Sequence, residues 1–460
     1  SYSSAASDVY KRQILNGPVL KMICKLSLPN SITGISMVLI VISDAYFVSK
    51  LGNVSLASLA LVFPFITLMQ MMSAGAIGGA STSSISRFLG ANLIDSANSA
   101  IWHAVLIGIS MSIIYSVIFV LFPKYIFMSM GADNDVLEGA IDFSQIAFGG
   151  AVFTWLLYIL SAVLRAIGEF VIPAIVQISG CFLQIVLAGA LTLGWFGFPN
   201  FGLMGPAIAM IFSHFIMVLY LYFYIKSKQN IVKLCPYPLN KKSFFDIMKV
   251  GIGGLINSTT IAGTVGVVTA TVSYYGVDAL AGYGLGSRLE IIITPLVFGI
   301  GSVLTATVGI NAGANQINRA RNIAWVGAIT SFLLVGIISG IVSFYPELWL
   351  DNFQTNFLSK QSAILYLIIV GPFYCFFAAG QTLYFASQGT GKIFYPVLVG
   401  IIRFLSVSII CYLAIKFSWS INSIFYAVSF GLGITGIGLG LCMLGRDWKS
   451  EINQKKTLNT

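Results

Sequence analysis

One acidic side chain, Asp44, stands inside a long apolar run, with neighbours such as Val41 and Phe47. An ionised group at the centre of a bilayer costs about 2.5–3.5 kcal/mol or more, and these neighbours provide no cation to offset that cost. A carboxyl group so placed can alternate between a neutral, protonated form and an anion that attracts a cation. That chemistry is what a cation-coupling site requires. The alternative is that Asp44 lies at the water interface, hydrogen-bonded to Ser43 or to a helix end.

A second set of charged residues lies in apolar runs of the C-terminal half. Glu290 is the acidic residue of that half that falls well inside such a run. Arg288 is two residues away and therefore on a different face of a helix, so it is not an obvious partner. Arg403, in another apolar run, could neutralise Glu290. The set is either a structural ion pair or a second site for a proton or a substrate.

Other patterns that could carry chemistry are missing from the sequence. His103 and His214 are far apart and have no carboxylate at a metal-binding spacing, and the six cysteines form no CxxC pair. The glycine-rich runs lie in apolar segments and are not followed by Lys-Ser/Thr, so they are not phosphate loops. We therefore expect no metal site, no cofactor and no enzymatic activity.

The composition decides which solvent surrounds the chain. Of its 460 residues, 57% are hydrophobic and 9% are charged, whereas soluble proteins carry about 25% charged residues. So few charges cannot cover the surfaces of several soluble domains. The composition therefore excludes a soluble enzyme and indicates that lipid surrounds most of the molecule.

Apolar runs of 20 or more residues recur along the whole chain, and each is long enough to cross a hydrocarbon core of about 30 Å as a helix. They are continuously apolar, whereas the strands of a membrane barrel alternate. We predict an all-α integral membrane protein with twelve transmembrane helices. The expected spans are 28–50, 55–80, 98–122, 140–164, 170–196, 202–225, 249–274, 280–310, 324–346, 361–386, 393–415 and 420–444.

The basic residues predict the orientation of these spans. With the N-terminus inside, most of the 25 Lys and Arg fall in cytoplasmic segments, as the positive-inside rule requires. The exceptions are Lys50, Lys124, Lys360 and Lys416 in outside segments and Arg288 and Arg403 within spans. Both termini are therefore expected in the cytoplasm. The same placement explains the net charge of +10 without a nucleic-acid partner.

The two halves of the chain match each other at a nearly constant offset. Since each half contains six spans, both enter the membrane in the same direction, which predicts two six-helix lobes related by a parallel internal repeat. Asp44 has an apolar counterpart, Val268, so the acid belongs to the first half alone. The matches pair Lys25, Gly52 and Ala57 with Lys249, Gly276 and Ala281; Gly90-Ala91-Asn92 with Gly313-Ala314-Asn315; Trp102 with Trp325; and Gly168 and Pro173 with Gly391 and Pro396.

The predicted organisation has five parts. Residues 1–13 form a polar leader, disordered or non-native, without the apolar core of a signal peptide. The N-lobe covers 14–225, a basic cytoplasmic linker covers 226–248, the C-lobe covers 249–446, and a cytoplasmic tail covers 447–460. Two similar lobes place a substrate cavity between them and can rock about it for alternating access.

From Ile14 to Arg446 the sequence resembles the multidrug and toxic compound extrusion (MATE) transporters. The resemblance implies a V-shaped pair of six-helix lobes that exports organic, often cationic compounds in exchange for protons or sodium ions. The motifs that carry it are Pro29 … Asp44-x-x-Phe47-x-x-x-Leu51-Gly52, Ser86-Arg87-x-x-Gly90-Ala91, Arg165-Ala166-x-Gly168, Gly205-Pro206-Ala207-x-Ala209 and Gly282 … Ser287-Arg288-Leu289.

The resemblance assigns Asp44 to the family's first-helix carboxylate. Related members carry an Asn in the fifth span and an Asp four residues later, where this chain has Gln184 and Ala188. Sodium prefers several hard oxygen ligands, whereas a proton needs one titrating group, so the missing carboxylate favours proton coupling. Gln184 is the expected partner of Asp44, with Asn30 and Thr33 as alternatives.

Pro29 should kink the first span, because proline removes one backbone hydrogen bond from a helix. The resemblance implies that bending at Pro29 changes the shape of the cavity as Asp44 is protonated. A purely structural role for this proline is the alternative.

We expect a secondary multidrug exporter in the plasma membrane, a monomer that takes small organic substrates and is driven by an ion gradient. The nearest alternative is a flippase for lipid-linked oligosaccharides from the same wider superfamily. Such a flippase should line its cavity with several basic residues for pyrophosphate, and Arg288 and Arg403 are the candidates.

Overall fold

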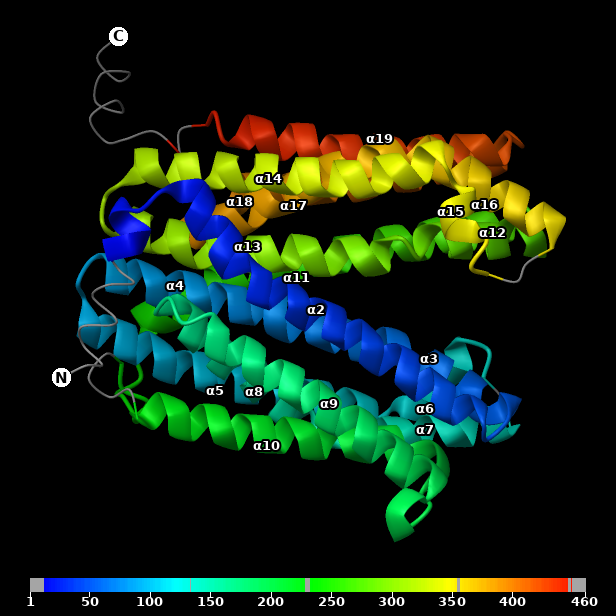
Figure 1. Cartoon of the computed structure of the whole chain (residues 1–460), viewed down its shortest axis with the longest axis horizontal. Helices are drawn as coiled ribbons and strands as arrows, with labels where there is room; N and C mark the ends of the chain where they lie inside the picture. The colour runs from blue at the N-terminus through cyan, green and yellow to red at the C-terminus, as the bar shows by residue number, and fades with distance from the viewer. Residues whose placement is uncertain (1–11, 133, 228–231, 354–355, 446–447, 449–460) are drawn as a thin grey trace. The chain divides into compact units, whose positions relative to one another are not determined.

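The computed structural model describes residues 12–132, 134–227, 232–353, 356–445 and 448. This part of the chain contains helices and no strand. It divides into two compact units (Figure 1). Unit 1 comprises the described residues within Ser1–Arg12 and Ile32–Ile252, and unit 2 those within Gln13–Ser31 and Gly253–Thr460.

Unit 1 contains most of the first long helix, α2 (Val19–Ser49), and the helices up to α10. Its second span is one continuous helix that loosens into a π-helix in the middle. The further elements are α3 (Asn53–Gln70), η1 (Met71–Ile77), α4 (Gly78–Gly90), α5 (Ile94–Leu121), α6 (Pro123–Ser129), α7 (Asn134–Gly149), α8 (Ala151–Ala166), α9 (Val171–Leu193), η2 (Trp195–Gly197), η3 (Gly202–Met204) and α10 (Gly205–Ser227).

Unit 2 contains most of α11 (Lys241–Ser273) and all helices that follow it. Two of its spans are interrupted, one between α12 and α13 and one by a 3-10 turn, η4. The further elements are α12 (Val277–Ser287), α13 (Glu290–Gly313), α14 (Ile317–Phe344), α15 (Glu347–Leu350), α16 (Phe357–Val370), η4 (Gly371–Phe373), α17 (Tyr374–Thr390), α18 (Phe394–Lys416) and α19 (Ile421–Cys442).

The predicted fold class is confirmed. Within the described residues, 11 helices are long and apolar enough to cross a membrane, and the pair α7–α8 makes up to 12. That pair is bent by 43° at Gly150, so the fourth span is broken where a continuous run was expected. In the tenth span the helix tightens into η4 at Pro372, a residue that cannot donate a backbone hydrogen bond.

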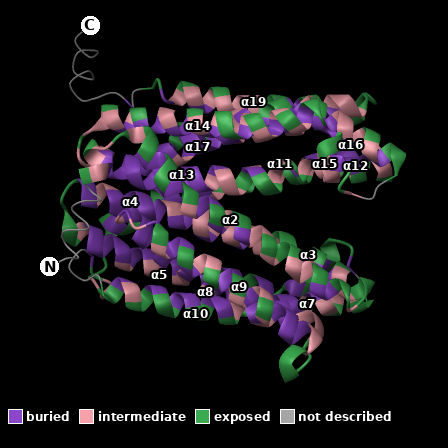
Figure 2. Ribbon diagram, viewed as in Figure 1, coloured by how far each residue is buried: buried purple, intermediate pink, exposed green. Residues whose placement is uncertain are grey.

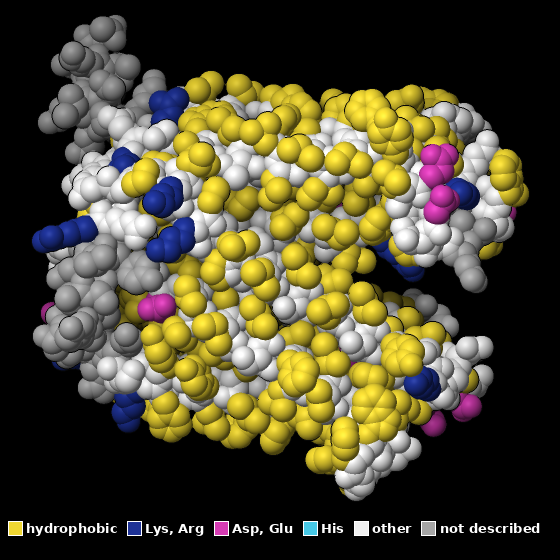
Figure 3. Space-filling view, viewed as in Figure 1, with side chains coloured by type: hydrophobic (Ala, Val, Ile, Leu, Met, Phe, Trp, Pro, Cys, Tyr) yellow, Lys and Arg dark blue, Asp and Glu magenta, His cyan; other side chains and the backbone are white. Residues whose placement is uncertain are grey.

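Side chains are distributed as lipid requires. Large hydrophobic residues such as Phe182, Phe223 and Ile337 are exposed, whereas helix α4 buries a run of small polar residues, Ser81–Ser84. Small residues let helix backbones approach each other closely inside a membrane. Figure 2 shows the buried faces of α4 and α8, and Figure 3 shows hydrophobic side chains along the lengths of the helices with charged ones near their ends.

The internal repeat is visible in the backbone and in side-chain contacts. Gly52 and Gly276 precede α3 and α12 with φ values of 109° and 107°, and α5 and α14 each have 28 residues. Thr82 Oγ1 donates to the carbonyl oxygen of Ala162, and the equivalent Thr305 Oγ1 donates to that of Phe385. Hydrogen bonds at equivalent positions confirm that the halves share one architecture.

Helices α2 and α11 each contribute to both units. Helix α2 belongs to unit 2 up to Ser31, and α11 belongs to unit 1 up to Ile252. The predicted boundaries, 14–225 for the N-lobe and 249–446 for the C-lobe, differ from this division at both helices. The reason is local packing: Arg319 of unit 2 donates to the backbone oxygens of Ile14 and Gly17, and Asp246 pairs with Arg87 of unit 1.

The predicted leader and tail fall mainly outside the described residues. Of the leader, 1–13, only Arg12 and Gln13 are described, and both are helical. Of the linker, 226–248, residues 228–231 are not described, and Lys241 already begins α11. Of the tail, 447–460, only Trp448 is described, and it is buried.

Candidate functional site

Asp44 lies in unit 1, five residues before the C-terminal end of α2 at Ser49. Its side chain is half-buried, and its Oδ1 is buried without a hydrogen-bond partner among the described residues. Buried acceptors are nearly always paired in folded proteins, because an unpaired one costs about 1–3 kcal/mol. The geometry leaves Asp44 Oδ1 available for a proton or a cation.

Two contacts join α2 to α9 on either side of Asp44. On the N-terminal side of Asp44 along α2, Cys181 Sγ donates to the backbone oxygen of Ser36 at 3.0 Å. On the C-terminal side of Asp44, Phe47 packs in a buried cluster with Ala188 and further residues of α9 and α10. Asp44 lies between Ser36 and Phe47 on α2, as Gln184 lies between Cys181 and Ala188 on α9. The two side chains therefore occupy the same segment of this helix pair.

Gln184 provides a second unsatisfied oxygen in that segment. The residue is 3% exposed, and its Oε1 is buried without a partner in the described part of the chain. Cys181, one turn earlier on α9, is close enough to Asp44 for the two groups to interact electrostatically. The site thus combines one carboxyl group and one amide oxygen, both withdrawn from water and neither hydrogen-bonded through the named atom.

The alternative partners of Asp44 are separated from it. Asn30 lies 14 residues earlier on α2, about 21 Å along the helix, and its Nδ2 donates to Ser302 Oγ in unit 2 at 3.0 Å. Thr33 is 11 residues earlier, about 16 Å along the helix. Asn30 and Thr33 are therefore too far away to bond Asp44.

Pro29 lies within α2, which continues as one helix across this residue. The change from unit 2 to unit 1 follows two residues later, after Ser31. In the repeat, Pro29 aligns with Gly253, the first residue of α11 that belongs to unit 2. Both long helices thus change units beside a residue that weakens a helix.

Glu290 begins α13 directly after the break in the eighth span. Tyr374 Oη donates to Glu290 Oε1 at 2.9 Å, and the hydroxyl groups of Tyr374 and Tyr366 are 2.8 Å apart. The sequence drew attention to Glu290, but it gave no signal for the two tyrosines. They lie on α16 and α17, more than 70 residues further along the chain, and only the packing of unit 2 brings them to the carboxylate.

The structure brings Arg403 to the same cavity as Glu290 but leaves Arg288 outside it. Arg403 is 3% exposed and interacts electrostatically with Glu290. Yet no ion pair within 4.0 Å joins these two described residues. Arg288 is exposed, and its guanidinium lies 5.8 Å from the centre of the Phe353 ring.

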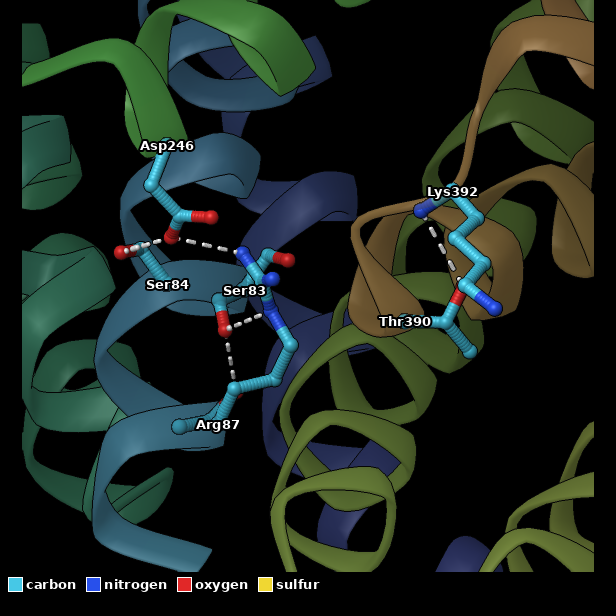
Figure 4. A network of polar contacts seen from close by, with 7 residues as sticks. Ser83, Ser84, Arg87, Asp246, Thr390 and Lys392 are labelled. Atoms are coloured by element: carbon cyan, nitrogen blue, oxygen red, sulfur yellow. Dashed lines mark hydrogen bonds and ion pairs between the residues drawn. The ribbon is translucent and has the colours of Figure 1, made fainter. Parts of the chain in front are cut away.

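A polar cluster at the start of α11 was not predicted. Asp246 Oδ2 accepts hydrogen bonds from Ser84 Oγ at 2.6 Å and from Arg87 Nη2 at 2.9 Å (Figure 4). The sequence analysis counted Arg87 among the basic residues of the cytoplasmic segments. The available signal was Asp246 itself, an acidic residue in an otherwise basic linker.

His103 is structural in unit 1. Its Nδ1–H donates to the backbone oxygen of Ser99, so Nε2 accepts from the backbone N–H of Asn240 at 2.9 Å. Together with the Asn98 side chain, which accepts from the backbone N–H of Lys233, it holds the described part of the linker against α5.

The model of the MatE family matches residues 29–189 and 258–413, one block in each half of the repeat. The chain belongs to the MatE family. The two blocks include Asp44 on α2, Gln184 on α9, Glu290 on α13 and Arg403 on α18. MatE membership confirms the family that the motifs resemble, and it identifies the chain as a membrane transporter.

Curated relatives of this MatE chain are named as transporters. It is 24% identical to the probable multidrug resistance protein NorM of Thermotoga maritima over 425 residues, 92% of this chain and 89% of the relative. It is 25% identical to the multidrug export protein MepA of Staphylococcus aureus over 70% of this chain and 72% of the relative. A third relative, 24% identical over 67% of this chain and 68% of the relative, is the FAD transporter of Shewanella oneidensis.

Solved structures share the MatE fold. A MATE protein in its bent conformation superimposes with a TM-score of 0.88, covering 98% of this chain and 99% of that chain at 20% identity. A MOP superfamily transporter from Pyrococcus furiosus, described as having a binding pocket of reverse polarity, gives a TM-score of 0.87 at 20% identity, covering 95% of this chain and 97% of that chain.

Proposed function

We propose that this protein is a secondary active multidrug exporter that exchanges a cation for organic, often cationic compounds by alternating access. The observation that carries the proposal is the buried, unpartnered Asp44 Oδ1 on a membrane-spanning helix. Membership in the MatE family and relatives named as multidrug exporters support the substrate class. We place it in the plasma membrane, with both termini in the cytoplasm.

Protons are the favoured coupling ion. The site between α2 and α9 offers the Asp44 carboxyl group and Gln184 Oε1, while the nearby backbone oxygen of Ser36 already accepts from Cys181. A bare metal cation in such a site would need several further oxygen ligands. A proton needs only the carboxyl group, and once bound it converts an acceptor into a donor.

Asp44 would couple export by being either protonated or available to a cationic substrate. The protonated form is neutral and no longer attracts an organic cation, so proton entry from outside favours substrate release there. Pro29, beside the point where α2 changes units, is our proposed hinge for the change in shape that accompanies protonation. Movement at this hinge would alter which side of the membrane the site faces.

The flippase alternative requires several basic side chains in a cavity to hold a pyrophosphate group. Of the two arginines proposed for that role, only Arg403 lines the cavity of unit 2, and Arg288 lies on the surface. The exporter therefore remains the better-supported function.

Efflux from proteoliposomes tests the coupling ion. Purified protein is reconstituted into liposomes that are loaded with ethidium. Efflux is then driven by an imposed pH gradient, or by an imposed sodium gradient at constant pH. We expect the pH gradient alone to accelerate efflux at least tenfold over liposomes without a gradient. Acceleration by sodium alone would contradict proton coupling, and no acceleration by either gradient would contradict the exporter.

A further inference from the structure

A cavity of about 60 Å³ lies within unit 2, apart from the helix pair that carries Asp44. At about 30 Å³ for each water molecule in the liquid, such a space holds roughly two water molecules. Its lining combines two opposite charges with aromatic rings, from Glu290, Arg403, Tyr283, Tyr366, Tyr374 and Phe377. The coupling mechanism proposed above uses none of these residues.

The two charged groups face the cavity without neutralising each other directly. Glu290 and Arg403 interact electrostatically, yet no ion pair within 4.0 Å joins them in this described region. Arg403 Nη2 makes one long hydrogen bond, 3.4 Å, to Thr260 Oγ1, and its buried Nε has no partner. A buried guanidinium with an unused donor is costly and is normally matched by an oxyanion.

Each of the two groups also contacts another helix of unit 2. A Cβ at Gly431 of α19 would lie 3.4 Å from Arg403 Cγ and 2.7 Å from Val407 Cγ2, so the arginine stem rests directly against that glycine. On the other side, Tyr374 donates to Glu290 Oε1. Each of the two groups thus has a contact of its own within unit 2, the arginine stem with α19 and the carboxylate with Tyr374.

Aromatic rings line the space near the charges. Tyr366 packs edge-on against Tyr283 at 5.4 Å and against Phe425 at 5.2 Å, which fixes its orientation. Ring faces attract ammonium groups, by about 0.5–2 kcal/mol for a well-placed cation. A lone organic cation would nevertheless meet Arg403, and a lone anion would meet Glu290. Only a ligand that carries both charges can pair with Glu290 and with Arg403 at once.

We propose that this cavity binds the two charged groups of small zwitterions, with an ammonium group at Glu290 and a carboxylate or similar oxyanion at Arg403. The binding site itself follows from the geometry of unit 2. That such compounds are also exported rests on the proposed function, and it would extend the substrates from organic cations to amphoteric compounds.

Equilibrium binding to the full chain in detergent tests the proposal without any mutation. The first probes share one aromatic body: phenylalanine (both charges), its methyl ester (ammonium only) and 3-phenylpropionate (carboxylate only). A longer set is 4-(aminomethyl)benzoate, its methyl ester and 4-methylbenzoate. In at least one set, we expect the zwitterion to bind at least tenfold more tightly than either singly charged probe.

Two variants assign the charges, and a third is a conservative control. Arg403→Gln should abolish the preference for the zwitterion over its ester, and Glu290→Gln should abolish the preference over the carboxylate-only probe. Arg403→Lys keeps the charge but loses the planar fork, so it should retain part of the first preference. Equal binding within both sets, or preferences that survive Arg403→Gln and Glu290→Gln, would overturn the proposal.

Ethidium efflux by the unaltered protein, measured on the same preparation, separates the two claims. Efflux without zwitterion binding overturns this inference alone and leaves a water-filled structural cavity. Zwitterion binding without gradient-driven efflux supports the site and overturns the exporter.

Discussion

Asp44→Asn is expected to abolish gradient-driven efflux while leaving the protein folded. Asparagine has nearly the same size as aspartate and still offers an oxygen, but it cannot take up a proton at any physiological pH. Because the coupling we propose depends on one titrating group, we expect a loss of at least a hundredfold in the initial rate of ethidium efflux under a pH gradient. Rates are measured in proteoliposomes containing matched amounts of protein.

Asp135→Asn is the matched control, since Asp135 is an exposed acid in the first turn of α7. It should retain the efflux rate of the unaltered protein within about twofold. Both variants should elute as the unaltered protein does in size-exclusion chromatography. Substantial proton-driven efflux by Asp44→Asn would show that another group carries the proton.

Gly380→Val should prevent stable packing of unit 2. A Cβ at Gly380 of α17 would lie 2.6 Å from the backbone oxygen of Thr435 on α19. The obstacle is helix backbone and cannot rotate away as a side chain can. Overpacking of this kind costs about 1–3 kcal/mol or more, so we expect a clearly lower melting temperature in detergent, or loss of the monodisperse peak.

Gly340→Val provides the comparison for that substitution. Gly340 lies on α14, also in unit 2, and a Cβ there meets nothing within 4 Å. The same change of residue type should leave the melting temperature nearly unchanged or slightly higher. If Gly380→Val and Gly340→Val have the same melting temperature, the close approach of α17 and α19 does not contribute to the stability of unit 2.

The frame of the protein could be predicted because lipid imposes strict rules on sequence. A span must be apolar over about 20 residues, so runs such as 98–122 and 393–415 correspond to α5 and α18. The repeat was readable since turn residues with unusual backbone angles recur: Asn92 and Asn315, at equivalent positions, have φ values of 61° and 58°.

Breaks within spans were not predicted, because hydropathy reports composition and not helix continuity. The bend at Gly150 and the interruption before Glu290 lie inside runs whose mean hydropathy is high enough for a membrane span. The division of α2 after Ser31 also escaped notice, since nothing in its hydropathy changes there. It follows from tertiary contacts, such as the hydrogen bond from Asn30 to Ser302.

The candidate site was only partly predictable for a related reason. A carboxyl group in an apolar run is costly wherever it lies, so Asp44 and Glu290 were conspicuous in the sequence. Their surroundings depend on residues distant in the chain. Tyr374 beside Glu290, and Arg403 across a cavity and not in a direct ion pair, are results of packing that no local spacing encodes.

Proton release on substrate binding tests the central claim most directly. Ethidium is added to purified protein in weakly buffered detergent solution, and the pH is followed with an indicator dye. If Asp44 holds either a proton or the cationic substrate, the unaltered protein should release close to one proton for each ethidium bound, and Asp44→Asn should release none. Equal release by both proteins, or binding to the unaltered protein without release, would contradict the account.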